Sequence, residues 1–287
     1  MAKLVITKLA DALGAEVSGA DLSKPIPKDE LEQIFAAWKA HLVLRFRGTE
    51  LSDPQLLAVS RYFGEIDPPG PNSYGKPFLE DFPDINVISN IKSGDQHIGG
   101  LGDGEAVWHA DMTYIDTPPK ASFLHALEIP EFGGNTSWGN MCLAYDTLPS
   151  HLKQEIKGRK AIHDGTYNSA GMIRKGMKDV TDPREAPGAH HPLVAKHPES
   201  GLPTLFLGRR RNSYILGMDL EASNQLLDAL WEHAGSPEFT FTQVWQLHDL
   251  ILWDNRCTLH RRDSFDPKAR RLMHRTQIKG SSVIPFE

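Results

Sequence analysis

The chain has 287 residues, of which 40% are hydrophobic and 24% charged, a composition typical of a globular protein. Its net charge is −6 at pH 7 and it has no block of five like charges, so nucleic acid is not expected as a partner. It contains only Cys142 and Cys257, which excludes a disulfide framework and favours a reducing compartment. No stretch approaches the ~18 apolar residues of a membrane span, and the N-terminal residues do not resemble a signal peptide. We therefore expect a soluble, cytoplasmic protein with no membrane partner.

The N-terminal part predicts two helices and a strand. Residues 28–41 carry apolar side chains at helical spacing and predict an amphipathic helix. Residues 42–48 follow as a strand. The second helix is expected to begin after Ser52 or Asp53 as N-cap, with Pro54 at the first helical position, where a missing backbone N–H costs nothing.

Short strands dominate the rest of the chain. They are rich in β-branched and aromatic residues and bounded by Gly, Pro, Asn or Asp. We predict them at residues 85–90, 107–114, 121–130, 135–138, 191–198, 203–208, 240–246, 250–255 and 271–278. Helices are expected at 140–158, with a break at Pro149, and at 219–235, ended by Gly235. Many short strands with few helices predict a mainly β fold with helices, a sandwich or jelly roll, in one domain over residues 1–287.

A β-hairpin and a long irregular segment are also predicted. Residues 194–206 predict a β-hairpin with its turn at 199–201. Residues 165–190 show little apolar periodicity and are too long for a simple connection, so we expect a lid or mobile loop there.

The stretch VWHADMTY, residues 107–114, contains the first candidate metal ligands. In a strand, residues i and i+2 point to the same face, so His109 and Asp111 would project side by side. The motif alone is weak, because chance gives roughly one or two His-x-acid pairs in such a composition. The chain has a second pair at His197 and Glu199. This pair lies at the expected hairpin turn, where side chains would be exposed to solvent. His197 is therefore not expected to be a ligand.

A third candidate ligand, His260, follows the apolar strand at 250–255. Two histidines and one carboxylate leave three metal positions open, which is the pattern of non-haem Fe(II) oxygenases. A structural zinc site would instead close with four protein ligands, usually including cysteine. The chain has no Cys-x-x-Cys motif, so zinc fits poorly.

Two arginines follow His260 in the last predicted strand. Arg271 and Arg275 are four residues apart, so they share one face of a strand and can point into the same cavity as the metal. Buried arginines need anions, and their fork geometry suits carboxylates. An iron site beside two inward-facing arginines suggests a carboxylate cosubstrate and an anionic substrate.

Together these residues resemble the taurine dioxygenase / 2,4-dichlorophenoxyacetate dioxygenase family of Fe(II)- and 2-oxoglutarate-dependent oxygenases. The resemblance covers essentially the full length of the chain, and the block that contains His260, Arg271 and Arg275 is its most specific part. The segments that carry it are LGAEVSGADLSKPI (13–26), LVLRFRG, RYFGEI, WHADMTY, GGNTSW and LWDNRCTLHRRDSFDPKARRLMHRTQIKG.

The resemblance implies a double-stranded β-helix (jelly-roll) core, with Fe(II) held by His109, Asp111 and His260. It also implies 2-oxoglutarate and O2 as cosubstrates. Thr136 and Arg271 would hold the distal carboxylate of 2-oxoglutarate. Trp253 and Asn255 stand in the family's WDN turn and are interpreted as structural. We also expect a homo-oligomer, a dimer or a tetramer.

Several further residues bear on the substrate. Arg275 would face its anionic group. The sulfonate-binding members resemble one another in a histidine and a tyrosine after the FGEI-type block, whereas this chain has Tyr74 and no histidine there. A carboxylate such as an aryloxyalkanoate is therefore favoured over a sulfonate. Where taurine-type enzymes share an aromatic pocket residue, this chain has three arginines: Arg211 is the candidate contact, with Arg209 and Arg210 as alternates, or the three form a solvated basic turn.

The expected reaction is hydroxylation of a small anionic organic substrate, with release of succinate and CO2. One alternative is a cupin-like metal-dependent isomerase or carboxylate-binding protein that does not activate O2, but such a protein would not need two anion sites. A serine hydrolase is not supported, because no Gly-x-Ser-x-Gly motif is present.

Overall fold

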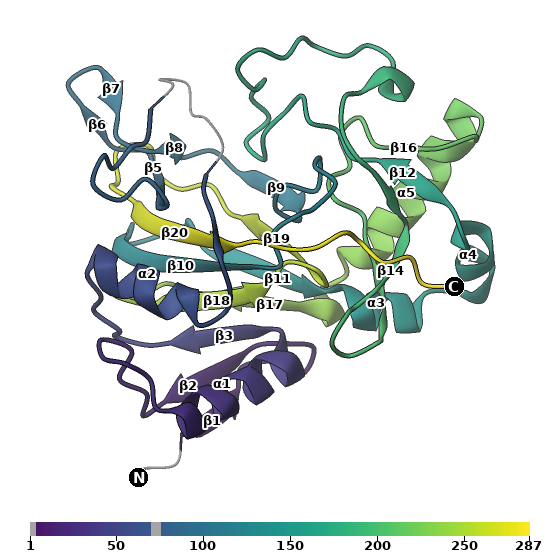
Figure 1. Cartoon of the computed structure of the whole chain (residues 1–287). Coiled ribbons are helices and arrows are strands. Elements are labelled where there is room, and N and C mark those ends of the chain that lie inside the picture. Colours follow the sequence, from purple (N-terminus) through teal and green to yellow (C-terminus); the bar gives the residue numbers. More distant parts are fainter. Residues whose placement is uncertain (1–3, 70–75) are drawn as a thin grey trace.

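The structure is a computed structural model that describes residues 4–69 and 76–287, so Tyr74 lies outside the described residues. Two β-sheets form its core (Figure 1). The nine-stranded sheet has the order β1 (Val5–Lys8), β2 (Ala15–Ser18), β3 (Val43–Phe46), β18 (Leu250–Asp254), β10 (Ala121–Glu128), β20 (Leu272–Ile278), β5 (Asn86–Ser89) and β8 (Gly100–Leu101), with β4 (Ile66–Asp67) paired to β20. The four-stranded sheet has the order β17 (Thr240–Gln243), β11 (Thr136–Asn140), β19 (Thr258–Arg262) and β9 (Ala106–His109). This mainly β architecture with a jelly-roll core confirms the predicted fold class.

Alternation along the strands of the large sheet divides its side chains between two apolar clusters. Phe123 and Leu252 pack with the helices α1 (Lys28–His41) and α2 (Asp53–Arg61). Their neighbours Leu124 and Trp253 instead pack with Trp138 of the four-stranded sheet. The second cluster therefore lies between the two sheets, and the helices cover the opposite face of the large one.

Smaller elements surround this core. They are α3 (Met141–Thr147), α4 (Ser150–Ile156), α5 (Leu220–Ala234), the three-stranded sheet of β12 (Lys160–Ile162), β13 (His190–Pro192) and β16 (Tyr214–Ile215), the hairpin of β14 (Val194–Lys196) and β15 (Pro203–Leu205), and the pair β6 (Lys92–Ser93) and β7 (Gln96–His97). A third apolar cluster joins α3 and α5 to the strands around them. None of the helices in the described part of the chain is long and apolar enough to cross a membrane.

The predicted helices are all found. The helix α2 begins after Ser52, whose backbone N–H donates to the Gln55 side chain at 2.8 Å, and Pro54 lies in its first turn. The break at Pro149 separates α3 from α4, and Gly235 caps α5. These positions were predictable because caps and prolines act through the local backbone.

Several details differ from the sequence-based expectation, and strands such as β1, β2 and β19, which carries His260, were not predicted. The strand predicted at 107–114 ends at His109. The strand predicted at 191–198 is divided into β13 and β14. The hairpin of β14 and β15 is confirmed, but His197 at its turn is only 3% exposed rather than solvent-facing. Residues 165–190 have little regular structure, apart from a 3-10 turn at Pro183–Glu185 and the first residue of β13. That this segment moves remains a prediction.

Candidate active site

The three candidate metal ligands lie together at one edge of the four-stranded sheet. His109 ends β9 and is paired directly with His260 of β19, and their ring centroids are 4.1 Å apart. The Nε2 atom of each histidine lies 3.9 Å from Oδ1 of Asp111. All three side chains are buried, and the three ligand atoms lie within 4.8 Å of one another. The structure thus brings the predicted ligands to one point.

Asp111 reaches this point by a different route from the predicted one. Because β9 ends at His109, the two residues do not share a strand face. Asp111 lies in the following turn, where Met112 has a φ of 50°. Its backbone is held by Asn255, whose Oδ1 accepts from the Asp111 N–H at 2.7 Å and whose Nδ2 donates to the Asp111 carbonyl at 3.0 Å. The turn and Asn255 together replace the strand geometry that the sequence suggested.

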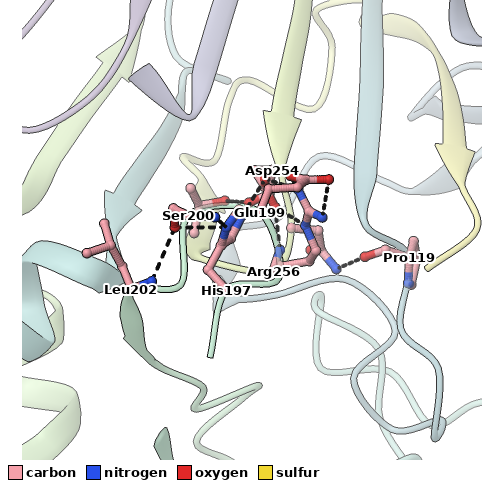
Figure 2. A network of polar contacts seen from close by, with 9 residues as sticks. Pro119, His197, Glu199, Ser200, Leu202, Asp254 and Arg256 are labelled. Atoms are coloured by element: carbon pink, nitrogen blue, oxygen red, sulfur yellow. Dashed lines mark hydrogen bonds and ion pairs between the residues drawn. The ribbon is translucent and has the colours of Figure 1, made fainter. Parts of the chain in front are cut away.

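The residue before Asn255 is fixed by a buried polar network (Figure 2). His197 Nε2 donates to the Asp254 carboxylate at 3.0 Å, and Arg256 donates to it from Nε at 2.9 Å and Nη2 at 2.6 Å. Arg256 also holds Glu199 through two contacts of 3.0 and 2.6 Å. Burial would raise the pKa of Asp254, but Arg256 and His197 lower it to about 2. The turn that carries Asn255 is therefore anchored to the β14–β15 hairpin.

His197, Asp254 and Cys257 also lie close enough to hold a metal ion. The hydrogen bonds argue against it. The Nδ1 atom of His197 accepts from the Ser200 N–H at 3.1 Å, and the Asp254 oxygens are occupied by His197 and the Arg256 guanidinium. This cluster is thus a hydrogen-bonded support and not a second metal centre.

The Asp111 carboxylate is oriented by the opposite sheet. Ser122 of β10 donates to its Oδ2 at 3.2 Å, and Arg275 of β20 donates to its Oδ1 at 2.9 Å. Burial alone would raise the pKa of Asp111, but Arg275 and the two histidines hold it well below its usual range. The carboxylate is therefore ionised, which is the form that binds a metal.

The two histidines are held in the neutral form. The pKa of His109 is held well below its usual range, first by burial and then by the charges of His260 and Arg209. Burial lowers the pKa of His260 to about 4. The Nδ1 atom of His109 lies 2.7 Å from the Val107 carbonyl, which assigns the proton to Nδ1 and the lone pair to Nε2. Two neutral imidazoles and one carboxylate, with no fourth protein ligand among the described residues of the cluster, fit an Fe(II) ion with open positions.

Arg271 is the most deeply buried arginine among the described residues. Its side chain is 1% exposed, and burial followed by the charge of Arg262 lowers its pKa to about 9. Among the residues that the structure describes, no acidic side chain pairs with it, and its buried Nε atom has no hydrogen-bond acceptor. Its guanidinium lies 6.0 Å from the Trp245 ring, and Trp245 Nε1 donates to Thr136 Oγ1 at 3.1 Å. Trp245 thus contacts both residues predicted to bind 2-oxoglutarate.

The three consecutive arginines have three different environments. Arg211 is exposed and lies over the Tyr167 ring at 3.4 Å. Arg210 donates to Asp228 at 2.7 Å on the surface. Only Arg209 forms a backbone bridge with His109, and its charge acts on the metal-site histidines. The geometry therefore favours Arg209, one of the alternates, over Arg211 as a residue of the site.

Comparison with known proteins gives the family. The family model "Taurine catabolism dioxygenase TauD, TfdA family" matches residues 6–277. The chain belongs to the TauD/TfdA family. It is 31% identical to pentalenolactone F synthase of Streptomyces avermitilis, over 94% of this chain and 92% of that protein. It is 30% identical to the alpha-ketoglutarate-dependent 2,4-dichlorophenoxyacetate dioxygenase of Cupriavidus pinatubonensis, over 98% and 99% of the two chains. The crystal structure of AAD-2 in complex with Mn(II) and N-oxalylglycine superposes with a TM-score of 0.80 at 29% identity, covering 98% and 99% of the chains.

Sequence reasoning missed several residues of this TauD/TfdA site. The structural role expected for Asn255 agrees with its hydrogen bonds, but the sequence did not reveal that its partner is the main chain of a candidate ligand. Ser122 gave no signal, because a lone serine in an apolar strand has none. The role of His197 was hidden by its place at a hairpin turn, although its partner Asp254 lies next to Asn255 in the family's WDN turn.

Proposed function

We propose that this chain is an Fe(II)- and 2-oxoglutarate-dependent dioxygenase that hydroxylates a small anionic organic substrate and releases succinate and CO2. Family membership and the His109–Asp111–His260 cluster support the iron and the reaction class. A carboxylate such as an aryloxyalkanoate is favoured over a sulfonate as the substrate. The similarity to a 2,4-dichlorophenoxyacetate dioxygenase supports that preference.

The observation that carries the proposal is the buried, unpaired guanidinium of Arg271. A cation in such a place is costly unless an anion accompanies it. The distal carboxylate of 2-oxoglutarate would supply that anion, and Thr136 would add a hydroxyl. A cupin-like protein with a single anion site would not need both Arg271 and Arg275 near the metal ligands.

The residues of the chain have separate tasks in this proposal. His109, Asp111 and His260 would hold the iron, which supplies the O2 activation and the redox chemistry when bound. Asn255, Ser122 and Arg275 keep Asp111 in position.

A further task is proposed for Arg275. Its Nε atom is buried without an acceptor, so the guanidinium has capacity beyond its contacts with Asp111 and Gln277. We propose that Arg275 binds the anionic group of the substrate. An anion held there would keep the reacting carbon close to the iron, because a positional error of about 1 Å can cost on the order of 100-fold in rate.

The direct test is succinate release. Purified protein is incubated with Fe(II), 2-oxoglutarate and O2 together with a panel of small carboxylates, sulfonates and sulfate esters. Substrate-dependent succinate, matched by hydroxylated product, supports the proposal. O2-independent chemistry, or carboxylate binding with no 2-oxoglutarate consumption under any condition, favours the cupin-like alternative.

A further inference from the structure

We propose that Arg209, with Arg174 beside it, forms a second anion-binding position next to the metal triad, and that the substrate is a small organic acid with two anionic groups. The inference rests on the proposed function, because it treats this position as part of the substrate site. It concerns residues that reach the triad from a different part of the chain than Arg275.

The chain path places Arg209 at the triad. The Gly208 carbonyl accepts from the Ala110 N–H at 3.0 Å, and Arg209 pairs with His109 across an antiparallel bridge. The charge of Arg209 contributes to the lowered pKa values of both His109 and His260, in each case after burial. Arg209 therefore approaches the two imidazoles from the segment beside β9, whereas Arg275 reaches Asp111 from the nine-stranded sheet.

Arg209 is half-buried, and no acidic side chain among the described residues bonds to it. Its Nη1 donates to the Tyr167 carbonyl at 2.7 Å, and its buried Nε has no acceptor. Burial, followed by the charge of Arg174, lowers its pKa to about 10. Arg174 donates from Nε to the same Tyr167 oxygen at 3.3 Å. Two cations thus share one neutral acceptor, an arrangement that an anion between them would relieve.

The neighbouring Arg210 shows that the environment of Arg209 is specific. Arg210 lies on the surface and is paired with Asp228 at 2.7 Å. Arg209 has no such partner in the part of the chain that the structure describes, since the nearby carboxylates of Asp111 and Asp164 act on it only through space. The oxygens of Asp164 accept instead from the Thr166 N–H at 2.8 Å and from Asn212 at 3.2 Å.

Charge balance indicates how many anionic groups the substrate carries. With Fe(II) and 2-oxoglutarate bound, the charges of the ion, Asp111, the cosubstrate and Arg271 cancel. Arg275, Arg209 and Arg174 then remain as positive charges, and the one further carboxylate that acts on Arg209 is that of Asp164. Two positive charges remain on partly buried arginines beside the metal triad, and a substrate with two carboxylates or similar anionic groups would balance them.

A purely structural role for Arg209 is the competing explanation. In that case the guanidinium only fastens the 165–190 segment through the Tyr167 carbonyl. Its loss would then weaken the binding of every substrate to the same extent, whatever the charge. Preference for a dianion over a matched monoanion separates the two explanations.

The test measures binding to protein loaded anaerobically with Fe(II) and saturating 2-oxoglutarate. Calorimetry compares 4-carboxyphenoxyacetate with phenoxyacetate, and straight-chain dicarboxylates of four to ten carbons with the monocarboxylates of equal length. We expect the best dianion to bind at least roughly tenfold more tightly than its monoanion, since one buried charge pair contributes that much. Arg209→Gln should abolish the preference, Arg209→Lys should keep part of it, and the adjacent control Arg210→Gln should keep all of it.

Two results overturn the inference. One is equal binding within every pair, or no binding by any dianion, in the unmodified protein. The other is an unchanged preference in Arg209→Gln. The absorption band of the Fe(II)–2-oxoglutarate complex, recorded on the same samples, reports the proposed function separately. A normal band without dianion preference overturns this inference alone, whereas a missing band overturns the proposed function as well.

Discussion

Asn255 holds the main chain of Asp111 on both sides, accepting from its N–H at 2.7 Å and donating to its carbonyl at 3.0 Å. The same Asn255 Nδ2 donates to the Pro119 carbonyl at 2.9 Å. Because Asp111 lies beyond the end of β9, no strand ladder fixes its backbone at this point. The Asn255 amide therefore sets where the only carboxylate of the candidate metal site lies.

Replacing Asn255 with alanine should lower the affinity for Fe(II) or Mn(II) by roughly 10–100-fold, as the loss of a residue that orients a ligand does elsewhere. Mn(II) binding measured by calorimetry or electron paramagnetic resonance checks this. The matched control is Asn224→Ala, which removes a surface asparagine that contacts Arg210. Wild-type affinity in a folded Asn255→Ala protein would contradict the role assigned to this side chain.

Arg271→Ala should raise the 2-oxoglutarate concentration needed for half-saturation sharply, because truncating one partner of a desolvated charge pair costs on the order of 2–5 kcal/mol. Thr136→Val should cost less, since it removes a neutral hydrogen bond worth about 1 kcal/mol. The control is Arg270→Ala, an adjacent exposed arginine paired with Glu128. If Thr136→Val proves more damaging than Arg271→Ala, the assignment of the two residues is wrong.

Arg275→Ala separates substrate binding from 2-oxoglutarate binding. At saturating metal, which compensates for the lost contact with Asp111, the variant should still bind 2-oxoglutarate. It should consume 2-oxoglutarate slowly with little hydroxylated product, because the reacting carbon is no longer held in place. Mass spectrometry gives the ratio of succinate to product. If the variant loses 2-oxoglutarate binding but keeps a one-to-one ratio of succinate to product, the roles assigned to Arg275 and Arg271 are reversed.

The network under Asn255 should make stability depend on acid pH. The pKa of Asp254 is lowered from 3.8 to about 2, so its ionised form stabilises the fold above pH ~4, and this contribution is lost as the pH falls through 2. The lowering corresponds to about 2 kcal/mol. The free energy of unfolding, measured with urea, should differ most between wild type and Asp254→Asn at neutral pH, and the difference should shrink between pH 4 and 2. A constant difference over that range would show that the carboxylate is not held in its charged form.

Local signals in the sequence were enough for most elements of the fold. The N-cap at Ser52, the break at Pro149 and the cap at Gly235 act through the neighbouring backbone, so the helices could be placed directly. The strand predicted at 107–114 was too long. The alternation of apolar and polar residues continues past His109, but the strand ends there and the chain turns at Met112.

The candidate site could be predicted where residue type and spacing indicate the chemistry. It was less predictable where contacts between residues far apart in the sequence determine which side chains meet. His109 and His260 become neighbours only through the pairing of β9 with β19, which spacing alone does not reveal. The choice among the three arginines depended on which one the chain path brings beside β9, and that residue is Arg209. His197 appeared exposed because its partner Asp254 is 57 residues away in the sequence.

The central claim is that His109, Asp111 and His260 hold an Fe(II) ion that binds 2-oxoglutarate. The most direct measurement is an anaerobic titration of Fe(II) and 2-oxoglutarate, followed by the visible absorption band of the complex in wild type and in His109→Ala, Asp111→Ala and His260→Ala. We expect a saturable band in wild type and none in the three variants, with the circular dichroism spectrum retained and succinate formation abolished. The absence of a band in wild type at saturating Fe(II) and 2-oxoglutarate would contradict the account. So would a band and succinate formation at wild-type levels in any of the three variants.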